Sequence, residues 1–186
     1  FELMAIQART GVNFIVVTHD QEEAMTLADR LAVMDKGQVR QVGRPLDVYE
    51  NPNSRYVAGF LGTVSQFEGR VIRAEGGTVT LSVADFACEI SVASPLDTRP
   101  GEVLTLALRP EKLRLTRERP EGPNTFPGTV KDLAYFGKDS LYRVILPSGG
   151  LISAHAVNAR RGAQAPDWDE ALWVSFEPGA AILLRD

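Results

Sequence analysis

Two different spacings of hydrophobic residues divide the chain. In residues 1–62, apolar side chains such as Ala24, Leu27 and Leu31 recur three or four positions apart, which predicts helices with one apolar face. In residues 63–186, short runs of alternating apolar and polar residues are separated by turns rich in Gly and Pro. That second pattern is typical of strands in a β-barrel or sandwich. The sequence therefore predicts two domains that meet near residue 62.

The start of the first domain has the pattern of an α/β crossover. A helix is predicted over Glu2–Thr10, and Gly11 is a suitable residue to end it. The wholly apolar, β-branched run Phe14–Val17 predicts a strand of a parallel sheet, buried on both faces. Asp20 can cap the helix that follows, and Glu23 completes a pair of the capping-box type.

A β-hairpin and two short helices are predicted for the rest of the first domain. Leu31–Met34 and Gln38–Val42 form the arms of the hairpin, and Gly37 supplies the positive φ angle of its turn. Pro45 suits the first turn of one short helix. A second short helix runs through Val57.

The second domain is predicted to consist of short strands joined by hairpin turns. The turns are Gly76–Gly77 and Pro147–Gly150. The loop Arg117–Asn124, rich in Pro and Glu, is predicted to lie on the surface between two barrel-like halves. The predicted strands are Phe67–Ile72, Thr78–Val83, Phe86–Ile90, Glu102–Leu108, a short segment at Leu113 and Leu115, Gly128–Tyr135, Ser140–Leu146, Leu151–His155 and Leu172–Phe176.

Composition narrows the classes of function. The 186 residues carry a net charge of −4, which argues against nucleic-acid binding through a basic surface. Cys88 is the only cysteine, so no intrachain disulfide can form and a reducing compartment is expected. No apolar run approaches the roughly 20 residues of a membrane-spanning helix. Any connection to a membrane is therefore expected to run through a partner.

His19 is the main candidate for chemistry. It follows the predicted strand Phe14–Val17 directly, and ligands of open α/β sheets bind at the carboxyl ends of strands. A lone histidine at a strand end is also common as a structural residue, so the position alone leaves both interpretations open. A structural role is the preferred interpretation for the remaining candidates, namely Asp20, Glu22, Glu23, Cys88, Arg109–Glu111, His155, Trp168 and Trp173.

The residues around His19 resemble a known family. Val17-Thr-His-Asp-Gln-Glu-Glu-Ala24, followed by Ala28-Asp-Arg-Leu-Ala-Val-Met-Asp-Lys-Gly-Gln38, is similar to the switch-histidine segment of the ATP-binding subunits of ABC transporters. The similarity is greatest to importers with a C-terminal regulatory extension. It continues through Gln41-Val-Gly-Arg-Pro-Leu-Asp-Val-Tyr-Glu-Asn-Pro52 and Val57-Ala-Gly-Phe-Leu-Gly62.

The second domain resembles the TOBE-type regulatory domain that follows the ATPase domain in these importers. The resemblance implies an α+β protein: a C-terminal remnant of a P-loop α/β ATPase domain in residues 1–62, then an all-β, OB-like TOBE barrel domain in residues 63–186. The segments that carry it are Arg99–Gly101, Ala107–Leu113, Gly128–Val130, Tyr135–Gly137, Ser175–Pro178 and Ala181–Leu184.

The resemblance implies a role for His19 in ATP hydrolysis. In this family the histidine contacts the γ-phosphate of ATP and helps to position the attacking water. ATP and Mg²⁺ are the cofactors expected of the full-length protein. The 186 residues contain no G-x-x-x-x-G-K-[ST] phosphate loop and no L-S-G-G-Q-like signature. The chain begins at Phe1, so we expect a fragment that does not bind ATP tightly, has no metal site and is inactive alone.

The partners and location are also implied by the family. The expected partners are the transmembrane subunits of a permease, a second copy of the ATPase subunit and, indirectly, an extracytoplasmic solute-binding protein. The expected location is the cytoplasm, on the inner face of the membrane. Phe60–Gly69 and Ser175–Pro178 look closest to polyamine (spermidine/putrescine) importers. No nucleic-acid partner is expected. The alternative is a stand-alone regulatory β-barrel or small-ligand-binding module.

Overall fold

The computed structural model describes residues 2–158 and 165–185. The chain divides into two compact units, Phe1–Gly62 (the first unit) and Thr63–Asp186 (the second unit).

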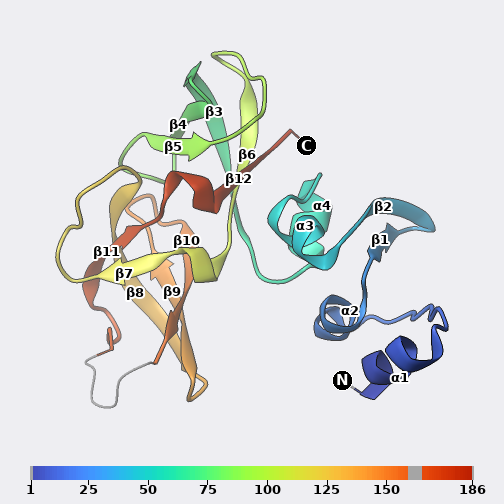
Figure 1. Cartoon of the computed structure of the whole chain (residues 1–186). Helices are drawn as coiled ribbons and strands as arrows, with labels where there is room; N and C mark the ends of the chain where they lie inside the picture. The colour runs from blue at the N-terminus through green and yellow to red at the C-terminus, as the bar shows by residue number, and fades with distance from the viewer. Residues whose placement is uncertain (1, 159–164, 186) are drawn as a thin grey trace. The chain divides into compact units, whose positions relative to one another are not determined.

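The first unit contains four helices and one β-hairpin among its described residues (Figure 1). The predicted hairpin is confirmed, and Gly37 in its turn has a φ of 78°. The predicted helix ending at Gly11 is also confirmed, since the Gly11 N–H donates to the carbonyl of Gln7 at 2.8 Å. The elements are α1 (Glu2–Thr10), α2 (Gln21–Leu27), β1 (Leu31–Asp35), β2 (Gln38–Gly43), α3 (Pro45–Glu50) and α4 (Arg55–Phe60).

A small hydrophobic cluster holds the hairpin and the short helices of the first unit together. The inward face of β1 packs against one side of α3 and α4, and Met25 and Ala28 add partly buried contacts. Helix α1 contributes no buried residue. The buried members of the cluster are Leu31, Val33, Val48, Val57 and Leu61.

The predicted strand Phe14–Val17 is wrong for this chain. The segment has no strand conformation, and its side chains face solvent, with Ile15 94% and Val17 95% exposed. A parallel strand exists only beside a neighbour that accepts and donates its backbone hydrogen bonds. The part of the first unit that the structure describes offers no such neighbour, because its two strands pair only with each other.

The second unit consists of two five-stranded antiparallel sheets. One has the order β12-β6-β3-β4-β5, and the other has the order β10-β9-β8-β11-β7. The strands are β3 (Ser65–Glu75), β4 (Thr78–Val83), β5 (Ile90–Ala93), β6 (Val103–Leu108), β7 (Arg114–Thr116), β8 (Thr125–Tyr135), β9 (Asp139–Ile145), β10 (Leu151–Val157), β11 (Ala171–Ser175) and β12 (Ala181–Leu184), with 3₁₀ turns η1 (Pro110–Lys112) and η2 (Pro178–Ala180).

The two sheets repeat one arrangement and exchange their last strands. Each is built on an 11-residue central strand, β3 or β8, that pairs on both sides and carries one register shift. After β6, the chain turns through η1 and adds β7 to the second sheet. After β11, it turns through η2 and adds β12 to the first sheet (Figure 1). The two halves of the second unit are thus two sheets, and each sheet is completed by a strand from the other half of the sequence.

Aromatic side chains join the two sheets in a common core. Phe67 of β3, Phe86, Phe126 of β8 and Phe176 form an edge-to-face series with ring centroids 4.8, 4.5 and 6.3 Å apart. All four rings are buried. Such pairs add about 0.5–1.5 kcal/mol each beyond the burial of their area.

Most predicted strands of the second unit are confirmed to within a few residues, and two differences have a clear cause. Phe86–Ile90 is not a strand: Phe86 follows a turn closed by its own N–H to the carbonyl of Val83, and the strand begins only at Ile90. Strand β12 is not among the predicted strands, and its pairing with β6 joins residues far apart in the sequence.

Candidate functional site

The candidate site is the turn Thr18-His19-Asp20, which leads into α2. Asp20 is the N-cap of α2, with φ −85° and ψ 113°, and its Oδ1 accepts from the N–H of Glu23 at 3.0 Å. The predicted capping role of Asp20 is confirmed. The N–H of Asp20 donates to Thr18 Oγ1 at 2.9 Å. The hydroxyl of Thr18 therefore takes the position that the capping-box prediction gave to the side chain of Glu23.

The imidazole of His19 is exposed to solvent. It makes no hydrogen bond or ion pair with any other residue that the structure describes. Glu22 and Glu23 lie exposed in the first turn of α2, where carboxylates favour the helix dipole. Both ring nitrogens of His19 are therefore available to a group from outside this chain.

His155 and Cys88 have surroundings that fit their structural interpretation. His155 Nε2 on β10 lies 3.4 Å from Asp139 Oδ2 at the start of β9. Partial burial raises the pKa of the Cys88 thiol, so less of it is present as the reactive thiolate.

Arg109 cannot serve as an open anion site. It lies between β6 and η1 and is only 1% exposed, whereas Glu111 in the same motif is exposed. A solvent anion could reach this guanidinium only after local unfolding. Its burial supports a structural role for the Arg109–Glu111 motif.

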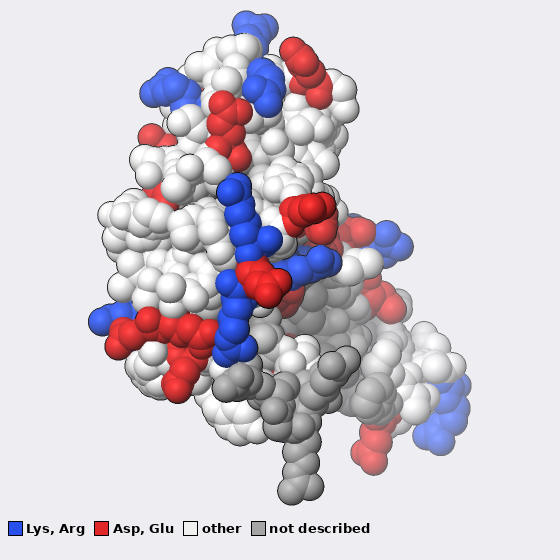
Figure 2. Space-filling view, turned by 90° about the vertical axis from the view of Figure 1, so that its left-hand side faces the viewer, with Lys and Arg blue, Asp and Glu red and all other residues white. Residues whose placement is uncertain are grey.

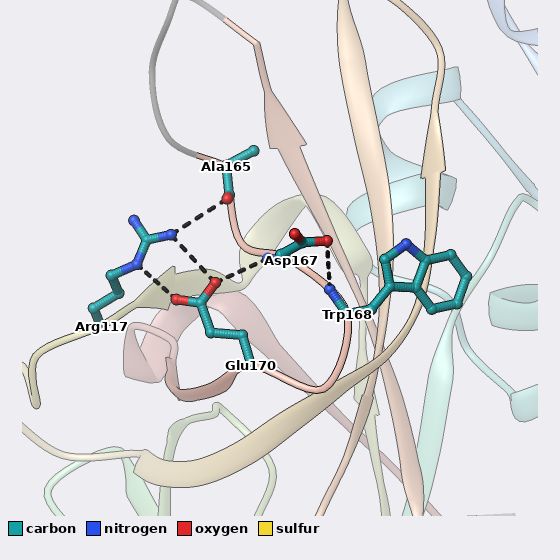
Figure 3. A network of polar contacts seen from close by, with 5 residues as sticks. All are labelled: Arg117, Ala165, Asp167, Trp168 and Glu170. Carbon is teal, nitrogen blue, oxygen red and sulfur yellow. Dashed lines mark hydrogen bonds and ion pairs between the residues drawn. The ribbon is translucent and has the colours of Figure 1, made fainter.

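A polar network ties two loops of the second unit together (Figure 3). Arg117 Nε donates to Glu170 Oε1 at 2.6 Å, and its Nη2 donates to Glu170 Oε2 at 3.2 Å and to the carbonyl of Ala165 at 3.3 Å. Glu170 also accepts from the N–H of Asp167 at 2.9 Å, while Asp167 accepts from the N–H of Trp168 at 2.8 Å. The bond from Arg117 is the main cause that lowers the pKa of the Glu170 carboxyl.

The two tryptophans lie in different surroundings. Trp168 is on the loop before β11 and is 56% exposed. Trp173 lies within β11, and the guanidinium of Arg119 stands 5.1 Å from its ring centroid. They do not form a ligand cage, in agreement with the interpretation of Trp173 as a packing residue.

Asn124 is the residue whose importance the sequence did not reveal. Its side chain accepts from the Ser91 N–H at 2.7 Å and donates to the Ser91 carbonyl at 2.8 Å, so one amide pairs with the outer edge of β5 like a further strand. The Asn124 carbonyl also accepts from the N–H of Phe176 at 3.4 Å. Asn124 is 2% exposed and has a φ of 55°, a conformation that Asn tolerates better than most residues. An Asn in a turn can therefore indicate a positive φ angle, and this is the feature of the sequence that could have pointed to Asn124.

Two shallow hollows lie on the second unit. One, of about 280 Å³, runs between the β3–β4 turn and residues 94–98. The other, of about 430 Å³, is lined by residues that include Arg117, Pro147 and Trp173. Both are open to solvent, and neither combines a buried charge with a converging set of polar groups.

An ATP–Mg²⁺ site combines several kinds of group. Such a site needs a cradle of backbone N–H groups, a lysine and oxygen ligands for the metal. Within residues 2–158 and 165–185, no three His, Cys, Asp or Glu side chains gather as metal ligands. His19 fits a single contact to a phosphate, and the remaining contacts would have to come from residues outside this set.

Two surface properties of the described residues bear on partners. On the face shown in Figure 2, cationic and anionic side chains lie next to one another. No helix among the described residues combines the length and apolar character needed to span a bilayer.

Comparisons with known proteins agree with the motif analysis. Residues 106–184 match the TOBE domain family. The chain is 39% identical, over all of its length and 49% of the relative, to the spermidine/putrescine import ATP-binding protein PotA of Pseudomonas fluorescens. It is also 39% identical, over 98% of its length and 49% of the relative, to the putrescine transport ATP-binding protein PotG of Escherichia coli. The chain thus spans about half the length of these relatives.

A solved structure shares the fold of part of the chain. It is the cytoplasmic molybdate-binding protein ModG, matched with a TM-score of 0.58 and 15% identity over 64% of this chain and 94% of that chain. At this identity the likeness concerns the fold alone.

The match to the curated relatives extends over both units, and it favours a transport subunit over a stand-alone ligand-binding module. The His19 segment and the TOBE segments also occur in the order expected of that family. The chain is similar along its whole length to import and transport ATP-binding proteins whose names specify polyamines, and residues 106–184 match the TOBE domain family.

Proposed function

We propose that the chain is the C-terminal portion of the ATP-hydrolysing subunit of an ABC importer that energises the uptake of a polyamine. The carrying observation is the whole-length match to import ATP-binding proteins whose names specify spermidine and putrescine. The chain spans only about half of their length, so ATP, Mg²⁺ and most of the hydrolytic machinery belong to the full-length subunit.

The first unit is the C-terminal part of an ATPase domain in this proposal. Its exposed apolar segment, with Ile15 and Val17 almost fully accessible, supports this assignment. Contiguous apolar surface of this kind is unusual on a finished domain. In the full-length subunit the rest of the ATPase domain covers it.

His19 is the residue of this chain that acts in hydrolysis. Bound ATP supplies the phosphoryl group that is transferred to water. His19 contacts its γ-phosphate and helps to orient the attacking water, and an exposed imidazole with two unengaged nitrogens can perform both tasks. The support is the position of His19 on a turn fixed by Thr18 and Asp20.

The second unit is the regulatory domain of the subunit. The subunit pairs with a second copy, docks on the permease at the inner face of the membrane and receives cargo indirectly through an extracytoplasmic binding protein. The TOBE match and the names of the relatives support these assignments.

The test is ATP hydrolysis by the full-length subunit with its permease in vesicles. We expect His19→Ala to lower kcat by about 100-fold or more, as removal of a group that orients a reacting proton does. His155→Ala is the matched control, since His155 is the other of the two histidines, and it should retain the wild-type kcat. Unchanged kcat in His19→Ala would contradict the role of His19.

The cargo is tested separately. In cells without their own polyamine importers, the complete transporter should restore uptake of labelled putrescine or spermidine. Restored ATP hydrolysis without polyamine uptake would keep the subunit assignment and reject the cargo.

A further inference from the structure

We propose that Thr18 and Asp20 are positioning residues that hold His19 in place for hydrolysis. The inference rests on the proposed function of His19. It concerns how this chain holds the imidazole in position. Among the described residues, no side chain makes a polar contact with that imidazole.

The position of the His19 side chain follows from its backbone. The imidazole is exposed and makes no polar contact with another described residue. Its Cα therefore has to be held by the turn itself. A group that orients water loses much of its effect when it moves by about 1 Å.

Two side chains close the turn on either side of His19. The bond from the Asp20 N–H to Thr18 Oγ1, at 2.9 Å, spans His19 and fixes the direction in which the chain leaves it. Asp20 is then anchored to α2, because its Oδ1 accepts from the N–H of Glu23 at 3.0 Å and its carbonyl accepts from the N–H of Ala24 at 3.1 Å. His19 is thus held between a hydroxyl before it and a capped helix after it.

A purely structural role predicts a different result. If these bonds only stabilise α2, their removal lowers the stability of the first unit but leaves kcat of the folded protein unchanged. If they position His19, kcat falls while KM for ATP stays nearly constant, since most contacts to the nucleotide lie outside this turn. The split between kcat and KM separates the two roles.

The experiment uses paired variants in the full-length subunit. Thr18→Val removes the hydroxyl at nearly constant volume, and we expect kcat to fall by about 10-fold or more with less than about a twofold change in KM. Thr18→Ser keeps the hydroxyl and should restore kcat to within about twofold. Thr26→Val, on the exposed side of α2, is the matched control and should behave as wild type.

The second pair acts at the cap. Asp20→Ala removes the acceptor for Glu23, whereas Asp20→Asn keeps an equally good N-cap oxygen. We expect a loss of kcat in the first variant and near wild-type kcat in the second. This pair decides the question should Thr18→Val fail to fold.

A direct readout exists in the chain itself. Amide hydrogen exchange at Asp20 should accelerate in Thr18→Val and stay slow in Thr18→Ser, because only the former loses the acceptor of that N–H. Normal kcat in Thr18→Val and Asp20→Ala, together with an inactive His19→Ala, would overturn this inference alone. An active His19→Ala would instead remove the proposed function on which it rests.

Discussion

The two units of the chain differ in how completely they cover their own apolar side chains. Among the residues that the structure describes, the buried cluster of the first unit comprises five side chains, whereas that of the second unit comprises 24. The first unit also exposes four consecutive apolar side chains, from Phe14 to Val17. The described residues of the second unit thus cover their apolar side chains more completely than those of the first.

The contrast shows that similarity to relatives and the extent of apolar burial are separate properties of the two units. Both units match the same relatives along the chain. The second unit has the larger buried core, and burial of apolar area is the main favourable term in folding. Substitutions should therefore have very different effects in the two units.

The largest expected effect is at the centre of the second unit. Phe126→Ala removes a fully buried ring that contacts Phe86 and Phe176, and should lower the free energy of unfolding by about 3–5 kcal/mol. Ile15→Ala, at a side chain that is 94% exposed, should change it by less than about 0.5 kcal/mol. Guanidinium denaturation of each variant measures both values. Equal losses at the two positions would show that the first unit is packed as well as the second.

The next effect concerns the link between Asn124 and β5. Asn124→Ala leaves the N–H and carbonyl of Ser91 without their partners, and should lower the free energy of unfolding by about 2–3 kcal/mol. Asn13→Ala, at an exposed position of the first unit, is the control and should be neutral. Thermal unfolding followed by circular dichroism gives the comparison. A neutral Asn124→Ala would mean that the edge of β5 is stable without its amide partner.

A smaller effect depends on pH. Arg117 lowers the pKa of Glu170 in the folded protein, so the resulting stabilisation is present above the ordinary Glu pKa of about 4.3 and is lost as pH falls through the lower folded value. Glu170→Gln should therefore weaken the acid dependence of the second unit's stability in that range. Denaturation curves from pH 6 downward, in steps of about half a unit, test this. Glu121→Gln on the exposed loop should leave the dependence as in wild type.

The smallest expected effect is at an exposed ion pair of the second unit. Arg73 and Glu89 are 3.5 Å apart, and their side chains are 55% and 56% exposed. Glu89→Gln should cost less than about 0.5 kcal/mol, because water and salt screen such pairs. A larger loss in urea denaturation would indicate that this pair contributes more than its exposure suggests.

Local turn chemistry explains why much of the fold could be predicted. Gly76 and Gly77, with φ angles of 58° and 78°, fix the β3–β4 hairpin by themselves, and Pro45 and Asp20 mark helix starts without help from distant residues. The exchange of β7 and β12 between sheets could not be seen, because it depends on pairing between segments far apart in the sequence. The strand prediction for Phe14–Val17 is wrong for a related reason. The composition of this segment favours a strand, but a strand also needs a neighbouring strand to pair with.

Some features of the candidate site could also be predicted from local sequence, whereas others depend on the folded structure. The capping role of Asp20 followed from its position before a helical pattern, whereas the bond to Thr18 depends on the geometry of a two-residue turn. The pairing of Arg117 with Glu170 joins residues 53 positions apart, and no local pattern announces it. The role of His19 in hydrolysis remains a prediction.

The exchanged strands have a consequence for synthesis on the ribosome. Residues 181–184, which form β12, are made after every other strand of the second unit, yet they complete the sheet that contains β3 and β4, which are made first. The early sheet must therefore wait, with the outer edge of β6 unpaired, through the translation of about 70 residues. At an elongation rate of roughly 5–20 residues per second, this delay lasts several seconds. Chaperones that shield open strand edges have that interval in which to act on the nascent chain.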